Sequence, residues 1–65
     1  MRVHVIRADL YNLLGVYYTQ IAEFDAAYDA FNSALELEPD NTDAERNRAI
    51  ALYYGDRFQL ALESI

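Results

Sequence analysis

The chain has 65 residues, with 11 acidic and 5 basic side chains, a formal net charge of -6 and no Cys. Phosphate groups are bound by clustered positive charge, so this balance excludes nucleic acid and anionic membrane surfaces as partners. The missing thiols exclude disulfides, thiolate metal sites and lipid attachment through Cys. The composition, with 54% hydrophobic residues, is that of a globular domain, and a chain this short buries only about 60% of its unfolded surface.

The first predicted helix covers residues 10–21, where apolar side chains recur three and four positions apart. They are Leu10, Leu13, Leu14, Tyr17, Tyr18 and Ile21. Residues 1–7 precede this helix and alternate as a strand would, but the chain offers no second strand for pairing. We therefore expect a frayed N-terminal lead-in, which is too short and too charged to be the core of a signal peptide.

A second amphipathic helix is predicted from Phe24 to Leu37 or Glu38. Its apolar residues follow the same spacing, and Asp, Asn, Ser and Glu side chains occupy the opposite side. Pro39 lacks a backbone N–H and disfavours helix in the residue before it, so the helix should end there.

Two further helices are predicted beyond the turn at Asp40 and Asn41. Thr42 and Glu45 have the spacing of a capping box, so the third helix should begin at Asp43. It should end at Gly55, because glycine tolerates the left-handed conformation found at helix ends. A fourth helix would then cover residues 57–65, and the short connections would make all four helices antiparallel neighbours.

An internal repeat is the most informative pattern in the chain. A tetratricopeptide repeat (TPR) is a helical hairpin of about 34 residues with aromatic, Leu-Gly, Tyr, Ala, Phe and Pro residues at set offsets. The matching residues are Tyr11, Leu14, Gly15, Tyr18, Ala27, Phe31 and Pro39. The chain therefore resembles the TPR family, with Tyr in place of Trp at the first position. The resemblance implies an all-α fold, a right-handed stack of antiparallel hairpins, with one repeat over residues 8–41 and a truncated second repeat over residues 42–65.

Two features depart from the TPR pattern. The positions expected to be apolar in the second repeat include Glu45 and Arg48, so we expect loose packing there or an acidic partner for Arg48. The other expected positions hold Ala49, Leu52, Ala61 and Ile65. Ala22 stands where the first hairpin usually has Gly, and a left-handed residue with a β-carbon costs about 1–2 kcal/mol. We therefore predict either a different turn or some loss of stability.

A narrower resemblance covers residues 11–65. The segments Phe24–Tyr28, Ala30–Phe31, Leu35–Leu37 and Asn47–Gly55 are similar to repeats of the NlpI-type family of bacterial outer-membrane lipoproteins. That resemblance implies an adaptor that dimerises at the inner face of the outer membrane and binds envelope proteases and peptidoglycan hydrolases.

In TPR folds the first helix of each hairpin lines a concave groove, which implies a partner-binding surface on this chain. The groove residues would be Asn12, Val16, Thr19, Gln20, Arg46, Asn47, Ile50 and Tyr54. Asn and Arg suit recognition of a peptide backbone or a carboxylate, and Tyr supplies contact area at low entropic cost. The alternative is that Val16, Ile50 and Tyr53 only pack between the hairpins.

A second expectation concerns self-association. Two hairpins leave the last helix with an open apolar edge, formed by Phe58, Leu62 and Ile65, because TPR arrays normally need three or more repeats. The chain could therefore act as a homodimer through this edge, as an alternative to binding a protein or peptide in the groove.

No catalytic, metal-binding or cofactor-binding residues are predicted. The acidic stretch that begins at Asp40 lacks the Gly and Glu that an EF-hand requires at its sixth and twelfth positions. His4 and Ser33 have no partners that would make a metal ligand, a general base or a nucleophile. We expect no enzyme activity and no direct membrane insertion. As written the chain predicts a cytoplasmic location, whereas a fragment of an NlpI-type lipoprotein would lie at the periplasmic face of the outer membrane.

Overall fold

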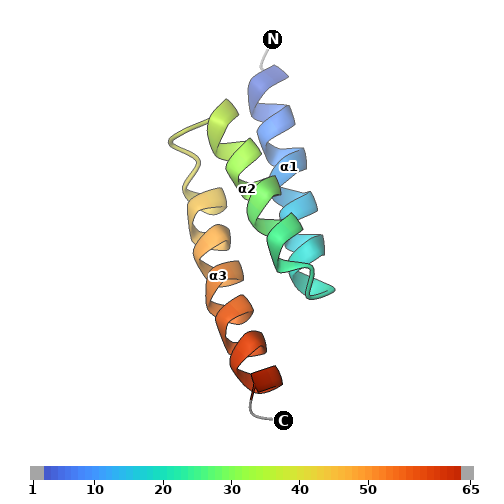
Figure 1. The fold of residues 1–65 in the computed structure, drawn as a ribbon. Helices are drawn as coiled ribbons and strands as arrows, with labels where there is room; N and C mark the ends of the chain where they lie inside the picture. Colours follow the sequence, from blue (N-terminus) through green and yellow to red (C-terminus); the bar gives the residue numbers. More distant parts are fainter. Residues whose placement is uncertain (1–2, 64–65) are drawn as a thin grey trace.

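The protein folds into three α-helices within the part of the chain that the structure describes, which is the backbone of residues 3–63 and the side chains of residues 6–63. This computed structural model contains α1 (Val3–Gln20), α2 (Phe24–Leu37) and α3 (Thr42–Glu63). Successive helices run antiparallel, and α2 lies between α1 and α3 in Figure 1. The predicted all-α fold is confirmed, and the end of α2 at Leu37 agrees with the position of Pro39.

The α1–α2 hairpin has the most extensive interface in the molecule. Phe31 is 1% exposed, Ala27 is fully buried, and the Phe31 ring lies against Gly15 of α1. A β-carbon at Gly15 would lie 2.5 Å from Cε1 of Phe31, which is too close for two carbon atoms. Val16 and Tyr18 pack against the same cluster. The small residues at positions 15 and 27, which the TPR offsets include, therefore allow the two helices to approach closely.

The turn between α1 and α2 uses a left-handed alanine. Ala22 has a φ of 62°, and its N–H donates to the carbonyl of Thr19 at 3.1 Å. The N–H of Glu23 donates to the carbonyl of Tyr18 at 2.8 Å, which completes a Schellman motif. The carbonyls of Tyr17, Tyr18 and Thr19 therefore have partners, but a residue with a β-carbon occupies the position that favours glycine.

The start of α3 differs by one residue from the prediction. Asn41 is the capping residue, because its Oδ1 accepts a hydrogen bond from the N–H of Ala44 at 3.0 Å. Its carbonyl also accepts from the N–H of Glu45 at 3.1 Å. Asn41 is 8% exposed, and Thr42 is the first helical residue, so the predicted Thr42–Glu45 capping box is wrong.

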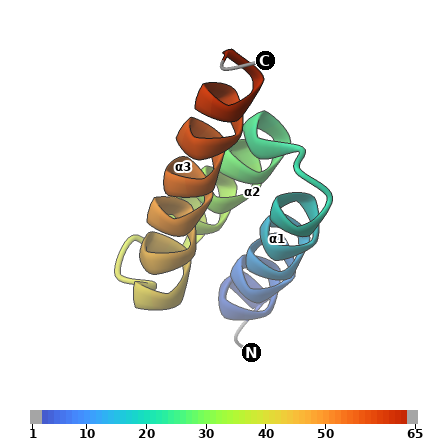
Figure 2. The same ribbon diagram turned by 90° about the horizontal axis from the view of Figure 1, so that it is seen from below.

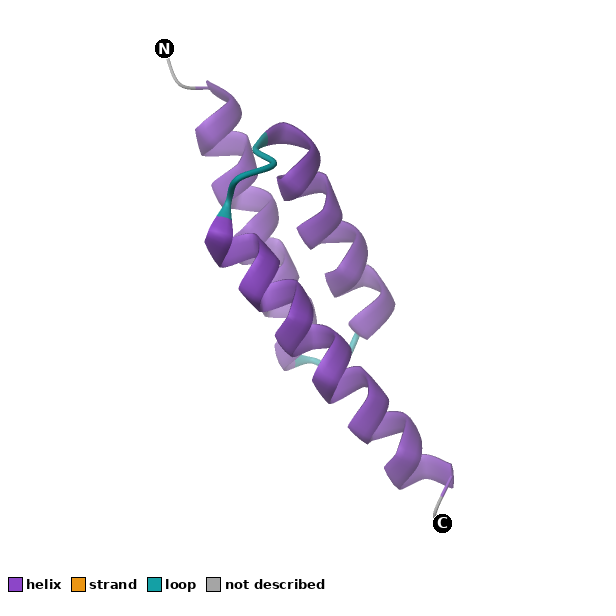
Figure 3. Ribbon diagram, turned by 90° about the vertical axis from the view of Figure 1, so that its left-hand side faces the viewer, coloured by secondary structure: helices purple, strands orange, loops and turns teal. Residues whose placement is uncertain are grey.

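Helix α3 continues without interruption through Gly55 to Glu63, so the predicted fourth helix is absent from residues 3–63. No glycine in this range has a positive φ, and Gly55 is an ordinary helical residue. One helical glycine costs only about 1 kcal/mol, whereas a turn there would require the short following segment to fold back on a small apolar face. Figure 3 shows α3 as one unbroken helix that passes the end of the hairpin.

The N-terminal segment is also more regular than expected, because α1 begins at Val3. Ala8 is fully buried and forms a second small core cluster with Ala34 and Ala44, which Leu35 and Leu37 cover. This contact stabilises the first turns of α1 as helix. The predicted frayed lead-in is therefore wrong for residues 3–7.

The molecule is elongated, with principal extents of 51 × 18 × 13 Å. Figure 2, which shows the molecule from below, places α1 and α3 on either side of α2, and the interface between α1 and α3 is the smallest of the three. With 22 residues α3 is about 33 Å long, whereas α2 with 14 residues is about 21 Å long. The last part of α3 therefore extends beyond the hairpin (Figure 1).

Candidate binding groove

A shallow groove lies between α1 and α3, where these helices make their limited contact. It contains a cavity of about 100 Å³. Its walls are Val16, Thr19 and Gln20 from α1 and Asn47 and Ile50 from α3, and Phe31 of α2 also lines it. Five of the eight residues that the sequence assigned to a groove therefore surround one small space.

An amide pair spans the two helices at one end of this groove. The Nδ2 of Asn47 donates a hydrogen bond to Oδ1 of Asn12 at 3.1 Å, and both side chains are half-buried. Asn12 lies one helical turn before Val16, so α1 presents both on one stripe. The bond uses one group of each amide, which leaves Oδ1 of Asn47 and Nδ2 of Asn12 as further hydrogen-bonding groups.

Two of the predicted groove residues, Arg46 and Tyr54, lie outside the cavity lining. Thr19 lines the cavity, but its hydroxyl donates to the carbonyl of Gly15 at 2.8 Å within α1. Arg46 pairs with Asp43 at 3.0 Å, and both side chains are about two-thirds exposed. A pair this exposed contributes little to stability. Tyr54 is 52% exposed and packs against the ring of Tyr53, outside the cavity lining.

The packing of α3 departs from the second-repeat pattern. Its buried residues are Ala44 and Ala51, whereas Ala49 is exposed and Leu52 is 50% exposed. Tyr53, which the alternative interpretation packed between the hairpins, is 57% exposed, and its hydroxyl accepts a hydrogen bond from Arg57 at 3.2 Å. Within residues 3–63 no fourth helix covers α3, and these side chains remain exposed.

Arg48 binds an amide, whereas the sequence left open either loose packing at this position or an acidic partner for Arg48. Its Nη1 donates to Oδ1 of Asn32 on α2 at 2.7 Å, and its guanidinium lies 5.9 Å from the ring centre of Tyr28. These contacts connect α2 and α3 next to the core, so a charged residue at this position is accommodated at the helix interface.

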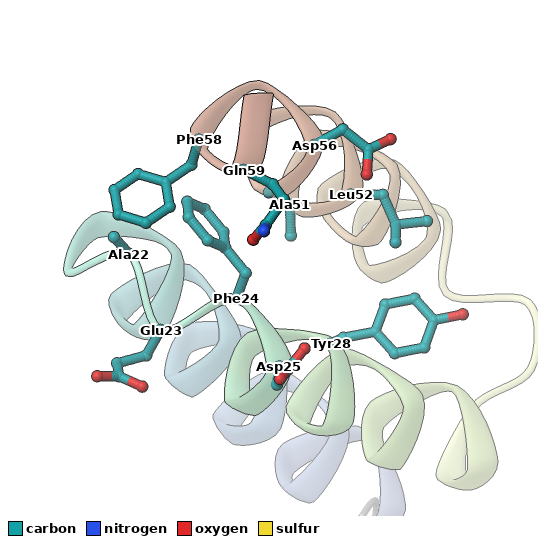
Figure 4. A pocket seen from close by; sticks show the side chains of 11 residues that line it. Ala22, Glu23, Phe24, Asp25, Tyr28, Ala51, Leu52, Asp56, Phe58 and Gln59 are labelled. Carbon is teal, nitrogen blue, oxygen red and sulfur yellow. The ribbon is translucent and has the colours of Figure 1, made fainter. Parts of the chain in front are cut away.

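A larger cavity, of about 480 Å³, lies on the other side of α3, between α3 and the start of α2. We call it the α2–α3 cleft, and its apolar residues are Phe24, Tyr28, Ala51, Leu52 and Phe58. Figure 4 shows these side chains from both helices, with Glu23, Asp25 and Asp56 also at the cavity. The Phe24 and Phe58 rings lie 5.7 Å apart. This cleft was not predicted, because Phe58 and Gln59 were expected on a separate fourth helix and not on a continuous α3.

Two of the three predicted self-association residues belong to the described structure. Phe58 is 47% exposed and Leu62 is 52% exposed, while Ile65 lies outside the described residues. Both occur in the part of α3 that extends past the hairpin.

Among the side chains that the structure describes, no three His, Cys, Asp or Glu residues come together as a metal site would require. None of the three helices combines the length and the apolar character needed to cross a bilayer. No protein-family model matches the chain, and no solved structure matches it.

Proposed function

We propose that this protein is a TPR-type interaction module that binds a segment of a partner protein in the groove between α1 and α3. The observation that supports this is the Asn12–Asn47 amide pair beside a cavity lined by Val16, Ile50 and Phe31. A site of this kind offers one donor and one acceptor next to an apolar surface.

An extended peptide supplies the complementary groups. Each of its residues carries one backbone N–H and one C=O, which Asn47 Oδ1 and Asn12 Nδ2 would bind. The cavity of about 100 Å³ has room for a small apolar side chain. Because the chain has a net charge of -6, association would be faster for neutral or basic segments than for acidic ones.

The proposed relationship to TPR proteins depends on the first hairpin. Close packing of Phe31 against Gly15 and the left-handed turn at Ala22 are the features expected of one such repeat. In this proposal α3 is the first helix of the next repeat, which places its groove residues opposite α1. An adaptor role like that of NlpI-type lipoproteins, with envelope proteins as partners, extends the same proposal to a periplasmic setting.

The experiment begins with peptides selected from a displayed random library on the immobilised chain. Their affinity is then measured by titration, and binding is located from the amide chemical shifts of the isotope-labelled protein. We expect the largest shifts at Val16, Asn47 and Ile50. Asn47→Ala should weaken binding about tenfold, since it removes a polar contact worth about 1–2 kcal/mol.

Gln59→Ala is the matched control, because it removes a carboxamide from the same helix outside the groove. It should leave the affinity unchanged, and both variants should keep the helical circular dichroism of the parent. Equal losses of peptide affinity in the two variants would rule out the groove as the binding site. Chemical-shift changes confined to the α2–α3 cleft would do the same.

A further inference from the structure

The cavity in the groove between α1 and α3 is small and neutral. Its volume is about 100 Å³. A cavity that accepts a benzene ring has roughly 150 Å³, and pockets for drug-sized ligands begin at roughly 300 Å³. Within the described part of the chain, the side chains that line the cavity are all uncharged. An ionised group placed there would lose water without gaining a partner of opposite charge. The cavity therefore disfavours aromatic rings and charged side chains.

From these properties we infer that the groove selects an extended segment whose side chain at the cavity is small and uncharged, of the size of Ala, Ser or Val, and that Ile50 sets this size limit. This selectivity rests on the proposed function, because a segment must first bind in the groove before the cavity can distinguish its side chains.

The three apolar side chains that line the cavity differ in their other contacts. Phe31 is 1% exposed, and Val16 packs against the core cluster that contains Phe31. Ile50 is 40% exposed and is in neither of the two core clusters that the described residues form. Ile50 is therefore the wall whose size limits the cavity without supporting the core. A change at this position alters the space for a ligand at little cost to the fold.

Carboxamides on both sides of the cavity fix the length of the segment. The Asn12–Asn47 pair lies at one end, and Gln20, which is exposed and lines the cavity, lies further along α1. From position 12 to position 20 the helix rises about 12 Å, whereas an extended peptide advances about 3.3 Å per residue. A segment of about four residues therefore reaches from one carboxamide to the other. Its backbone N–H and C=O groups would bind the carboxamides, so the groove distinguishes sequences at the side chain over the cavity.

Titration of a peptide series tests the selectivity. The starting peptide is the tightest binder from the displayed library that shifts the resonances of Val16, Asn47 and Ile50. Its cavity residue is the one whose replacement by Gly changes the Ile50 methyl resonances most. With that position varied, peptides that carry Ala or Val should bind at least about tenfold more tightly than those that carry Phe or Asp, which is the usual effect of one misfitting group.

Two variants change the cavity in opposite directions. Ile50→Ala removes the side chain beyond its β-carbon, so the Phe peptide should then bind at least as tightly as the Val peptide. Ile50→Phe fills the cavity and should weaken the Val peptide at least about fivefold while leaving the Gly peptide unchanged. Leu52→Ala is the matched control, because Leu52 is 50% exposed on the same helix but lines the α2–α3 cleft. It should keep the order of affinities of the parent protein, and all three variants should keep its helical circular dichroism.

Failure of the selectivity and failure of the proposed function give different results. If no selected peptide shifts the resonances of Val16, Asn47 and Ile50, the groove is not a binding site, and both proposals are overturned. If peptides bind in the groove but the Val and Phe peptides have equal affinity for the parent protein, only the selectivity is overturned. The same conclusion follows if Ile50→Ala and Leu52→Ala change the order of affinities alike.

Discussion

The chain reverses direction at Ala22 but continues as helix through Gly55, although glycine is the residue that favours reversal. Ala22 adopts a φ of 62° and closes the α1–α2 hairpin, while Gly55 remains helical in the middle of α3. The two positions follow helices that look alike in sequence, since each comes after a Tyr-Tyr pair and an amphipathic stretch. What differs is the segment that follows each of them.

After Ala22 the chain supplies a helix of 14 residues that buries Ala27, Phe31 and Ala34. The burial of Phe31 alone contributes about 2–3 kcal/mol, which exceeds the cost of a left-handed alanine at about 1–2 kcal/mol. The described segment after Gly55, residues 56–63, has Phe58, Leu60 and Leu62 as its large apolar residues, and all three are exposed. Reversal therefore depends on the apolar surface that it buries more than on the residue at the turn.

The largest expected effect comes from removing the side chain that holds the hairpin together. Phe31→Ala should lower the free energy of unfolding by about 3–5 kcal/mol. A domain of this size has roughly 3–10 kcal/mol in total, so most of the helical signal should be lost at room temperature. Urea denaturation followed by circular dichroism measures the change.

Leu13→Ala serves as the control for that experiment, because Leu13 is 63% exposed on the same hairpin. Its effect should stay within about 0.5 kcal/mol. Similar losses in the two variants would mean that Phe31 does not anchor α2 on α1, and the explanation for the turn at Ala22 would fail.

Replacing either helical glycine by alanine should change the free energy of unfolding by a smaller amount, and in opposite directions at the two positions. Gly55→Ala should stabilise the protein by up to about 1 kcal/mol, since a β-carbon there would lie 3.4 Å from Phe24 and improves helix propensity. Gly15→Ala makes the same change on α1 but should destabilise by about 1 kcal/mol, because the added β-carbon meets the Phe31 ring.

Thermal unfolding of both glycine variants decides between a continuous α3 and a hairpin at Gly55. If Gly55 formed the left-handed turn of a second hairpin, alanine there would cost about 1–2 kcal/mol and lower the melting temperature. A lower melting temperature for Gly55→Ala would therefore favour the four-helix arrangement.

The sequence predicted the parts of the fold that depend on the spacing of apolar residues along a helix and on the size of individual side chains. The amphipathic pattern located α2 and the body of α1, and the repeat offsets included both Gly15 and Phe31, which the structure brings into contact. Turn signals were less reliable. Gly55 predicted a helix end and Thr42 predicted a cap, and both predictions are wrong. The local preference of a residue does not depend on how much apolar surface the following segment can bury.

The groove was easier to predict than the cleft. The TPR resemblance assigned Val16, Asn47 and Ile50 to a groove, and these three residues line one cavity. The α2–α3 cleft is lined by Phe58 and Gln59 because α3 continues past Gly55, whereas the prediction placed these residues on a separate fourth helix. The sequence nevertheless indicated exposed apolar residues in this region, because Phe58 and Leu62 were predicted to form an open apolar edge.

The smallest expected effect tests the turn itself. Ala22→Gly relieves a left-handed conformation that costs about 1–2 kcal/mol for alanine, but glycine loses about 0.5–1 kcal/mol more entropy on folding. The net gain should be about 0.5–1 kcal/mol, visible as a rise of a few degrees in melting temperature. Ala26→Gly, in the first turns of α2, is the control and should lower the melting temperature, because it carries the entropy cost without relief of strain. If Ala22→Gly also lowered the melting temperature, the Schellman turn would not contain a strained alanine. The apolar surface that each following segment buries would then not explain why the chain reverses at Ala22 and continues as helix at Gly55.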